Sequence, residues 1–252
     1  MRLVVLGKSP AWPDPGGACS GYLLEEDGFA LLLDCGAGVF SKLTAVQDYL
    51  TLGAILISHL HADHILDLIP CSYALHLSPR RAQPPRRPPL HCPPGSQEMF
   101  HRLGACWKDE GLISEAFALA EYDPAEPLQI GPFAVRFCEV PHYTQAFACE
   151  LSAGSSRITF GADCGPNDAL AQFAQGTDLL IAEASLREPD TDEPPGHMTP
   201  LEAGEMGRKA QAKRLLVTHF SDELGAEWVR GESTRGFGAE VSLAAAGAEY
   251  TV

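Results

Sequence analysis

The spacing of apolar and polar positions predicts alternating strands and helices in the first part of the chain. Short apolar runs predict strands over Arg2–Leu6, Tyr22–Glu25, Phe29–Asp34 and Gly53–Ser58. The dipeptide Asp27-Gly28 lies between the second and third runs and predicts a hairpin turn. Apolar residues at intervals of three and four predict helices over Val39–Leu50 and Ile65–Leu77.

The same alternation returns in the second half of the chain. Strand-like runs cover Phe133–Val140, Gln145–Leu151, Arg157–Phe160, Asp178–Ala182 and Lys213–Thr218. Helices are predicted over Asn167–Ala174, from Thr199 onward and near Asp222–Arg230, before two short C-terminal strands. Thr199 is suited to cap its helix because Pro200 and Glu202 follow it in the first turn. The two similar halves predict an α/β protein in which two sheets pack face to face with helices outside.

Length and composition fit one globular domain that spans residues 1–252. Apolar residues make up 45% of the 252 residues and charged residues 20%, which is typical of a folded chain rather than a disordered one. The 18 basic and 33 acidic residues give a net charge of −15. This charge disfavours broad electrostatic binding to nucleic acid or anionic membranes, although a local basic patch is compatible with it. No apolar stretch approaches the roughly 18 residues of a membrane span.

The cysteines and the N-terminal sequence predict a cytoplasmic protein with reduced thiols. The eight cysteines include no C-x-x-C pair. The opening apolar run is too short for the core of a signal peptide. A disulfide framework is therefore not expected.

The segment Ser78–Pro89 is rich in proline and arginine and predicts an extended, exposed loop. In the simpler interpretation, it is only a solvent-exposed loop without a binding role. In the alternative, its arginines reach a phosphate ligand or a partner subunit.

The densest cluster of chemically active residues is Ser58-His59-Leu60-His61-Ala62-Asp63-His64, directly after a predicted buried strand. His59, His61 and His64 contribute imidazoles, and Asp63 contributes a carboxylate. Nitrogen and oxygen donors without a thiolate are typical of a site for a borderline-soft divalent metal ion. α/β proteins commonly place their sites in loops that follow strands.

Three further candidate ligands stand just past the C-terminal ends of other predicted strands. His142 follows the run that ends at Val140, Asp163 follows Phe160 after a short turn, and His219 follows Thr218. Together with the first cluster, these positions favour a metal site assembled from several strand ends.

The motifs SHLHADH at 58–64, GADC at 161–164 and THFS at 218–221, together with His142, resemble the metal motifs of the metallo-β-lactamase-fold superfamily. The resemblance implies a four-layer αββα sandwich with a dinuclear metal site, usually zinc, with manganese or iron as alternatives. By motif position, His59, His61 and His142 would hold one ion, Asp63, His64 and His219 the other, and Asp163 would bridge them. Asp63 would also be catalytic, by orienting the attacking water or accepting its proton.

A second pair of motifs narrows the resemblance. IAEASL at 181–186 and HMT at 197–199 are similar to elements of the ribonuclease Z group, in which a glutamate and a histidine act on the leaving group. The resemblance implies that Glu183 keeps His197 charged, so that His197 protonates a departing alkoxide. In the alternative, Glu183 supports a histidine that binds metal.

The ribonuclease Z enzymes carry a long arm for tRNA between the positions of His142 and Asp163, and this chain has room there only for two strands and a turn. The chain is more similar to compact relatives that resemble bacterial cyclic-nucleotide phosphodiesterases. We therefore expect a dinuclear zinc phosphodiesterase for a small phosphodiester such as a 3′,5′-cyclic nucleotide, with tRNA and membrane disfavoured as partners and a homodimer left open. The alternatives are a ribonuclease Z-type tRNA 3′-end endonuclease, an ester, thioester or lactone hydrolase, and a metal-binding protein without turnover.

Three more residues near these motifs allow two interpretations each. Trp12 lies in the loop after the first strand and either covers the site entrance or packs elsewhere. Ser20 either approaches a ligand or shapes the same loop. Cys164, beside Asp163, is expected to pack as a small buried apolar residue.

Overall fold

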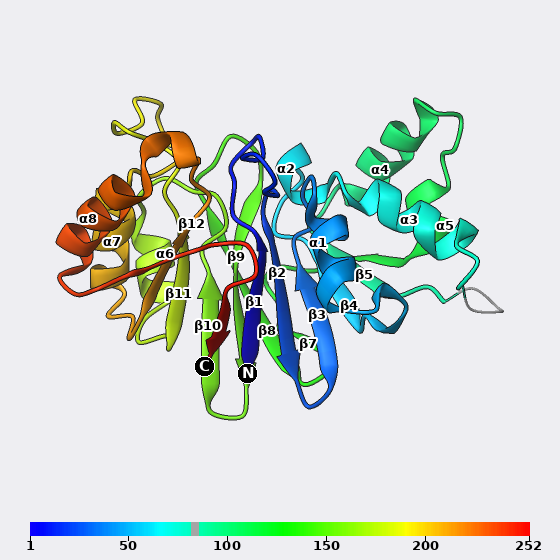
Figure 1. The fold of residues 1–252 in the computed structure, drawn as a ribbon, viewed down its shortest axis with the longest axis horizontal. Helices are drawn as coiled ribbons and strands as arrows, with labels where there is room; N and C mark the ends of the chain where they lie inside the picture. Colours follow the sequence, from blue (N-terminus) through cyan, green and yellow to red (C-terminus); the bar gives the residue numbers. More distant parts are fainter. Residues whose placement is uncertain (82–85) are drawn as a thin grey trace.

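The computed structural model describes residues 1–81 and 86–252. Two seven-stranded sheets form within these residues, in the orders β14-β1-β2-β3-β4-β5-β6 and β13-β12-β11-β10-β9-β8-β7. The sheets lie face to face, with α1 to α5 on the outer side of one and α6 to α8 on the outer side of the other (Figure 1). The predicted αββα sandwich is confirmed.

The first sheet joins an antiparallel part to a parallel part. Strands β1, β2 and β3 pair antiparallel, and β3, β4, β5 and β6 pair parallel. The strands are β1 (Arg2–Gly7), β2 (Gly21–Glu26), β3 (Phe29–Leu33), β4 (Ala54–Leu56), β5 (Pro89–Cys92), β6 (Ala118–Glu121) and β14 (Glu249–Thr251). Its helices are α1 (Val39–Val46), α2 (Ala62–Ile65), α3 (Leu68–Leu77), α4 (Ser96–Ala105) and α5 (Leu112–Ala116).

The second sheet has the same mixed construction. Strands β7 to β10 pair antiparallel, and β10 to β13 pair parallel. The strands are β7 (Leu128–Ile130), β8 (Phe133–Val140), β9 (Ala146–Ala153), β10 (Ser156–Phe160), β11 (Leu179–Glu183), β12 (Leu215–Thr218) and β13 (Ser242–Leu243). Its helices are α6 (Asp168–Phe173), α7 (Pro200–Lys209) and α8 (Ala226–Phe237).

The buried strands contribute side chains to two separate apolar cores. In β1, Leu3 and Val5 belong to the core between the sheets, whereas Val4 and Leu6 belong to the core beneath the helices of the first sheet. Successive side chains of a strand point to opposite faces, so a strand covered on both faces must be apolar throughout. This explains why β1 and several other strands read as continuous apolar runs rather than as alternating patterns.

Tertiary contacts and turn residues interrupt the predicted helices. The helix predicted over Val39–Leu50 ends at Val46, because Asp48 accepts a hydrogen bond from the Leu50 amide and starts a 3₁₀ turn over Tyr49–Thr51. The prediction over Ile65–Leu77 is wrong in being continuous: α2 ends at Ile65, and α3 starts at Leu68.

Asp67 stands between α2 and α3, where its carboxylate accepts from the Phe40 amide and its own amide donates to the Cys35 carbonyl. The helix predicted near Asp222–Arg230 is also displaced. A 3₁₀ turn over Asp222–Leu224 comes first, and α8 begins after Gly225, whose φ is +86°. No elements were predicted for residues 90–132, which contain most of β5 and all of β6, β7, α4 and α5.

The arginines of the proline-rich segment bind the protein's own surface. Residues 82–85 of that predicted loop lie outside the described residues, and Pro89 already belongs to β5. Arg80 donates to Asp48 at 2.6 Å, Arg86 to the Leu50 carbonyl at 2.6 Å and Arg87 to the Phe117 carbonyl at 2.9 Å. A role for this segment toward a partner subunit stays a prediction.

In the described part of the chain, no helix combines enough length with enough apolar character to cross a bilayer.

Candidate metal centre and active site

The candidate site residues meet at one edge of the two sheets. His142 follows β8, Asp163 follows β10, Glu183 ends β11, and His219 directly follows β12. These four strands run in the same direction, so their carboxyl ends share an edge. The loop after β4, which leads into α2, brings the histidine cluster to the same place (Figure 1).

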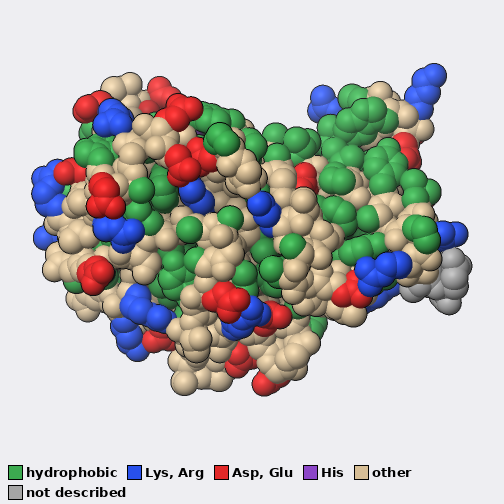
Figure 2. Space-filling view, viewed as in Figure 1, with side chains coloured by type: hydrophobic (Ala, Val, Ile, Leu, Met, Phe, Trp, Pro, Cys, Tyr) green, Lys and Arg blue, Asp and Glu red, His purple; other side chains and the backbone are tan. Residues whose placement is uncertain are grey.

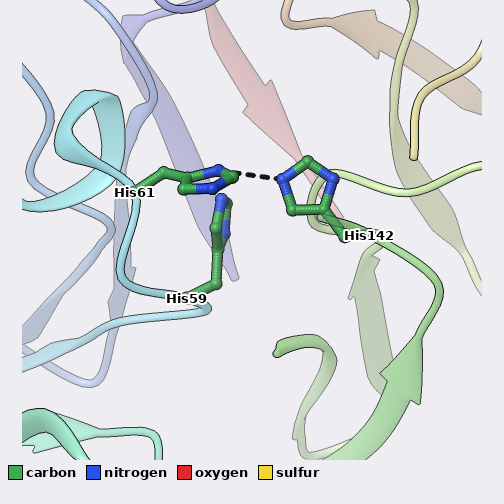
Figure 3. A group of neighbouring side chains, drawn as sticks. All are labelled: His59, His61 and His142. Atoms are coloured by element: carbon green, nitrogen blue, oxygen red, sulfur yellow. Dashed lines mark hydrogen bonds between the residues drawn. The ribbon is translucent and has the colours of Figure 1, made fainter. Parts of the chain in front are cut away.

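His59, His61 and His142 form one group of candidate ligands, with donor atoms that all lie within 4.8 Å of one another. Figure 3 shows the three rings converging, and Nδ1 of His61 lies 2.9 Å from Nε2 of His142. Nδ1 of His142 donates to the Gly196 carbonyl at 2.8 Å, which leaves the lone pair on Nε2. Burial lowers the pKa of each of the three imidazoles, so they are neutral donors at pH 7.

Asp63, His64, Asp163 and His219 form the second group, also within 4.8 Å. Nε2 of His219 lies 3.1 Å from Oδ2 of both Asp63 and Asp163, and Nε2 of His64 lies 3.2 Å from Oδ2 of Asp163. The same Asp163 oxygen is 3.8 Å from Nε2 of His59 in the first group. Asp163 therefore stands between the two groups.

Positive charge is needed around the buried carboxylates. Burial raises the pKa of Asp163, but His219 and His64 more than offset it and hold this pKa well below its ordinary value. Burial lowers the pKa of His64, yet Asp163 and Asp34 raise it well above its ordinary value. Buried carboxylates require such compensation, and a divalent cation supplies it equally well.

Asp34 orients two of the histidines. It is fully buried and accepts from Nδ1 of His64 at 2.7 Å and from the hydroxyl of Ser58 at 2.8 Å. Because that hydroxyl proton is committed to Asp34, the Ser58 oxygen accepts from Nδ1 of His59 at 3.0 Å. In both rings Nδ1 is held by this network and Nε2 is left to face the site, where a bound metal ion would take the place of the proton; such hydrogen bonds are the usual support of metal-binding histidines.

Nε2 of His59 is the clearest test of whether a metal ion fits. It is buried and has no hydrogen-bond partner among the described residues. The same is true of Nδ1 of His219. A buried ring nitrogen with a free lone pair is unfavourable unless something binds it. The nitrogen and carboxylate donors around it suit zinc, manganese or iron.

The backbone is strained where it turns into the site. Asp34 has a φ of +58°, Ala162 of +55° and His219 of +53°, and each stands within two residues of the end of a strand. The left-handed region costs a residue other than glycine roughly 1 kcal/mol or more. This strain aims the side chains of Asp34, Asp163 and His219 at the site.

Gly36 allows the histidine loop to approach β3. A Cβ atom at this position would lie 1.8 Å from the Asp63 carbonyl oxygen. The close approach lets the Cys35 amide donate to the His64 carbonyl at 2.7 Å. Only glycine fits between these two segments.

Glu183 and His197 form a hydrogen-bonded pair beside the two ligand groups. Nδ1 of His197 lies 2.6 Å from Oε1 of Glu183. Glu183 is buried and also accepts from the Cys164 amide at 3.1 Å and from the Ser185 hydroxyl at 2.5 Å. These contacts fix the carboxylate, which in turn fixes the imidazole.

The carboxylate of Glu183 favours the protonated, charged form of His197. Burial lowers the pKa of His197, but the hydrogen bond and the charge of Glu183 raise it to about 9. The ring lies 4.8 Å from that of His142 and 5.8 Å from that of His219, measured between centroids. An imidazolium is thus placed next to the candidate metal ligands.

A cavity of about 680 Å³ opens over these residues. One part of its wall consists of His61, Asp63, Asp163, His197 and His219. Trp12 lines it as well, with 52% of its surface exposed. Of the two interpretations of Trp12, the structure therefore supports the one at the site entrance.

Comparison with known proteins identifies the family. Residues 30–220 match the family model described as the beta-lactamase superfamily domain. The chain belongs to the metallo-β-lactamase superfamily. The family membership and the histidine–carboxylate cluster together indicate a metal-dependent hydrolase that binds a divalent metal ion.

Several known proteins are similar to the chain over most or all of its length. The Bacillus subtilis protein named Probable metallo-hydrolase YhfI is 30% identical over 98% of both chains. The crystal structure of YhfI matches with a TM-score of 0.86, at 29% identity and over 99% of both chains. A Ribonuclease Z from Mycobacterium bovis is 26% identical over 89% of this chain and 88% of its own. A diphosphatase from the PhnP family shares the fold, with a TM-score of 0.75 at 22% identity over 99% of this chain and 97% of its own.

The sequence did not single out Asp34, Ser185 or Tyr143 as site residues. Asp34 had a detectable signal, because it is a carboxylate directly after the apolar run Phe29–Leu33. The only sequence signal for Ser185 and Tyr143 was their proximity in the chain to Glu183 and His142.

Ser20 is 1% exposed, does not line the cavity and therefore shapes its loop. Cys164 is fully buried, as expected.

Tyr143 ties together the two loops that carry His142 and His197. Its hydroxyl donates to Asp190 at 2.6 Å, and Asp190 also accepts from the Gly196 amide at 2.8 Å. The Tyr143 ring lies 5.3 Å from that of His142 and 5.4 Å from that of His197. Tyr143 therefore contacts both loops at the site.

Proposed function

We propose that the protein is a dinuclear metal phosphodiesterase that acts on a small phosphodiester such as a 3′,5′-cyclic nucleotide. Zinc is the proposed metal, with manganese or iron as alternatives. The observation that carries the proposal is the Glu183–His197 pair beside the candidate ligands. Hydrolysis of an unactivated phosphodiester expels an alkoxide, and a histidine held protonated is suited to donate the proton that this alkoxide needs.

In this proposal, His59, His61 and His142 hold one ion, Asp63, His64 and His219 the other, and Asp163 bridges them. The arrangement is supported by the two compact donor groups and by the position of Asp163 between them. Bound divalent ions supply a more acidic water and a Lewis acid for the phosphoryl oxygen.

Asp63 is proposed to orient the attacking water or accept its proton. Burial raises the pKa of Asp63, but hydrogen bonds to His219 and His64 hold it well below its ordinary value. The carboxylate is therefore ionised at neutral pH, and it lines the cavity where a substrate would bind.

The dimensions of the site favour a small substrate over tRNA. A volume of about 680 Å³ lies within the usual range of small-molecule pockets. The interval between His142 and Asp163 is filled by β9 and β10, which form a hairpin, and it holds no extended arm. On the face shown in Figure 2, Lys and Arg side chains are dispersed among acidic ones rather than gathered into one basic patch.

A turnover screen tests the proposal. The zinc- and manganese-loaded protein is assayed on cyclic nucleotides, bis-p-nitrophenyl phosphate, a lactone, a thioester and a precursor tRNA. We expect turnover of the small phosphodiesters. Turnover restricted to the lactone or thioester, or cleavage of the tRNA in preference to every small phosphodiester, would contradict it.

A further inference from the structure

The cavity that the candidate metal ligands line also carries an exposed tryptophan, Trp12, on a well-anchored loop. We propose that Trp12, together with Leu186 and Leu224, forms a subsite for a planar aromatic ring and that this ring is the nucleobase of the substrate. The inference rests on the proposed phosphodiesterase function and adds to it the part of the substrate that this subsite selects.

The loop that presents Trp12 has a conformationally restricted backbone. Pro10, Pro13 and Pro15 restrict its backbone, because each proline ring locks φ. Trp12 nevertheless leaves 52% of its surface exposed rather than packing into a core. A large aromatic side chain held in this way at a cavity wall favours a ligand contact over a packing role.

Asp14 anchors the loop to the segment that follows His219. It is 7% exposed and accepts hydrogen bonds from Lys8 at 2.6 Å and from the hydroxyl of Ser9 at 3.0 Å. Its other oxygen accepts from the Ser221 hydroxyl and from the Asp222 amide, both at 3.0 Å. Because Ser221 stands two residues after His219, the position of Trp12 is coupled to the metal-ligand side of the cavity.

The lining of the cavity beyond the candidate site residues includes several apolar side chains. Besides Trp12, it contains Pro10, Ala11, Leu186 and Leu224, together with the charged Glu223. Arg187 also lines the cavity, where it donates to the Leu224 carbonyl at 3.0 Å and stacks 4.6 Å from the centre of the Trp228 ring. These contacts hold Leu224 in place and keep the Arg187 charge directed at protein groups.

The two parts of the cavity suit the two ends of a nucleotide. The phosphate belongs among the histidines and carboxylates, and an apolar, planar base fits the indole face and the leucines. Stacking of a base on an aromatic side chain is sequence-tolerant and typically changes affinity by roughly 10- to 100-fold on removal of the aromatic ring. The subsite therefore predicts a requirement for a base but weak discrimination between bases.

Binding of adenosine 5′-monophosphate and of ribose 5-phosphate, measured by calorimetry on the zinc-loaded protein, tests the subsite. Trp12→Ala is expected to weaken binding of the nucleotide by roughly 10- to 100-fold and to affect the sugar phosphate much less. Trp12→Phe should retain most of the nucleotide affinity, because phenylalanine also stacks. Trp107→Ala is the matched control, since Trp107 is 49% exposed and does not line the cavity.

Kinetics on 3′,5′-cyclic AMP and on the base-free ribose 3′,5′-cyclic phosphate give a second measurement. Trp12→Ala should raise KM for the nucleotide and change the base-free reaction far less. The subsite would be overturned if Trp12→Ala weakened the nucleotide and the base-free compound equally, or if it weakened neither. It would also be overturned if the wild-type protein did not bind the nucleotide. Nucleotide binding that depends on Trp12 without phosphodiester turnover would keep the subsite and reject the proposed function. Phosphodiester turnover that is unchanged in Trp12→Ala would reject the subsite but not the proposed function.

Discussion

At the scale of single residues, the hydrogen bond between Glu183 and His197 separates two chemical roles. A proton donor matters most when the leaving group is a poor one, whereas a residue that supports metal ligands matters for every substrate. The position of His197, bonded to Glu183 at 2.6 Å and facing the cavity, favours the first role.

His197→Ala is therefore expected to keep both metal ions. The rate on a substrate with an alkoxide leaving group should fall by roughly 10²- to 10⁴-fold, because the proton donor is lost. The rate on a p-nitrophenyl ester should fall much less, since p-nitrophenolate departs unprotonated. The measurement is kcat on both substrates together with metal content.

Equal losses on the two substrates, with metal affinity reduced roughly 10- to 100-fold, would instead assign His197 to the support of metal ligands. Glu183→Gln should behave like His197→Ala if the two residues act as a pair.

The raised pKa of His197 predicts the pH dependence. Because the pKa of the imidazole is raised to about 9, the protonated form persists below that pH and is lost above it. The rate on an alkoxide substrate should fall at a pH no higher than about 9, since nearby metal ions can only lower the pKa further. Glu183→Gln should shift this fall toward lower pH, and a p-nitrophenyl substrate should not show it. A fall at the same pH in wild type and variant would contradict the pairing.

Asp163 is the residue whose loss should affect both ligand groups. Its Oδ2 lies 3.1 Å from His219 and 3.8 Å from His59, so Asp163→Ala removes a contact shared by the two groups. We expect loss of at least one metal ion and of nearly all turnover, measured by elemental analysis and kcat. Asp168→Ala, on the exposed start of α6, is the control. Retention of both ions by Asp163→Ala would place the bridge elsewhere.

At the scale of elements, the loop between β11 and α7 carries His197 and is tied to the end of β8 by Tyr143. Tyr143→Phe removes only the hydroxyl that binds Asp190, and a hydrogen bond of about 1 kcal/mol corresponds to roughly a fivefold effect. We expect kcat on the alkoxide substrate to fall by roughly that factor, and further in Tyr143→Ala, which also loses the ring contacts with His142 and His197.

The p-nitrophenyl reaction should be less sensitive to both Tyr143 variants, because it does not need His197. Tyr73→Phe, on the exposed side of α3, is the control. Wild-type rates in Tyr143→Ala would show that the loop is positioned without this side chain.

Elements with strong local patterns were predictable, and those set by distant contacts were not. The hairpin of β2 and β3 follows from its apolar runs and the Asp27-Gly28 turn, and the start of α7 follows from the capping box of Thr199 and Glu202. The residues of strand β6 are mostly exposed, and β7 is only three residues long, so neither leaves a clear apolar pattern. The break between α2 and α3 depends on contacts of Asp67 with residues about 30 positions away.

At the scale of the whole molecule, the candidate ligands come from both sheets. His59 to His64 follow strand β4 of the first sheet, and His142, Asp163 and His219 follow strands of the second. A ligand that binds only the folded state stabilises it by RT ln(1 + [L]/Kd), or about 4 kcal/mol at a thousandfold excess over Kd. In a protein of this size, that corresponds to a shift of roughly 8 to 16 °C in Tm.

Removal of metal with a chelator is therefore expected to lower Tm by several degrees, as measured by differential scanning calorimetry. Zinc added back in excess should restore it. Asp163→Ala should show a smaller difference between the two conditions, because it has lost part of the site. Identical Tm values with and without the chelator would argue against a metal ion shared by the two sheets.

The chain itself encoded the donor chemistry and the alternation of strands and helices, because both depend on neighbours in sequence. His59, His61, Asp63 and His64 lie within six consecutive residues, and the strand before them is a continuous apolar run. The tertiary structure decided which distant groups meet: Nε2 of His142 at 2.9 Å from His61, and Asp34 against His64. It also placed Trp12 in the lining of the same cavity as His61, His197 and His219. Such distances depend on how the two sheets pack and on the directions in which strained turns point their side chains. Neither can be predicted from the spacing of residues along the chain.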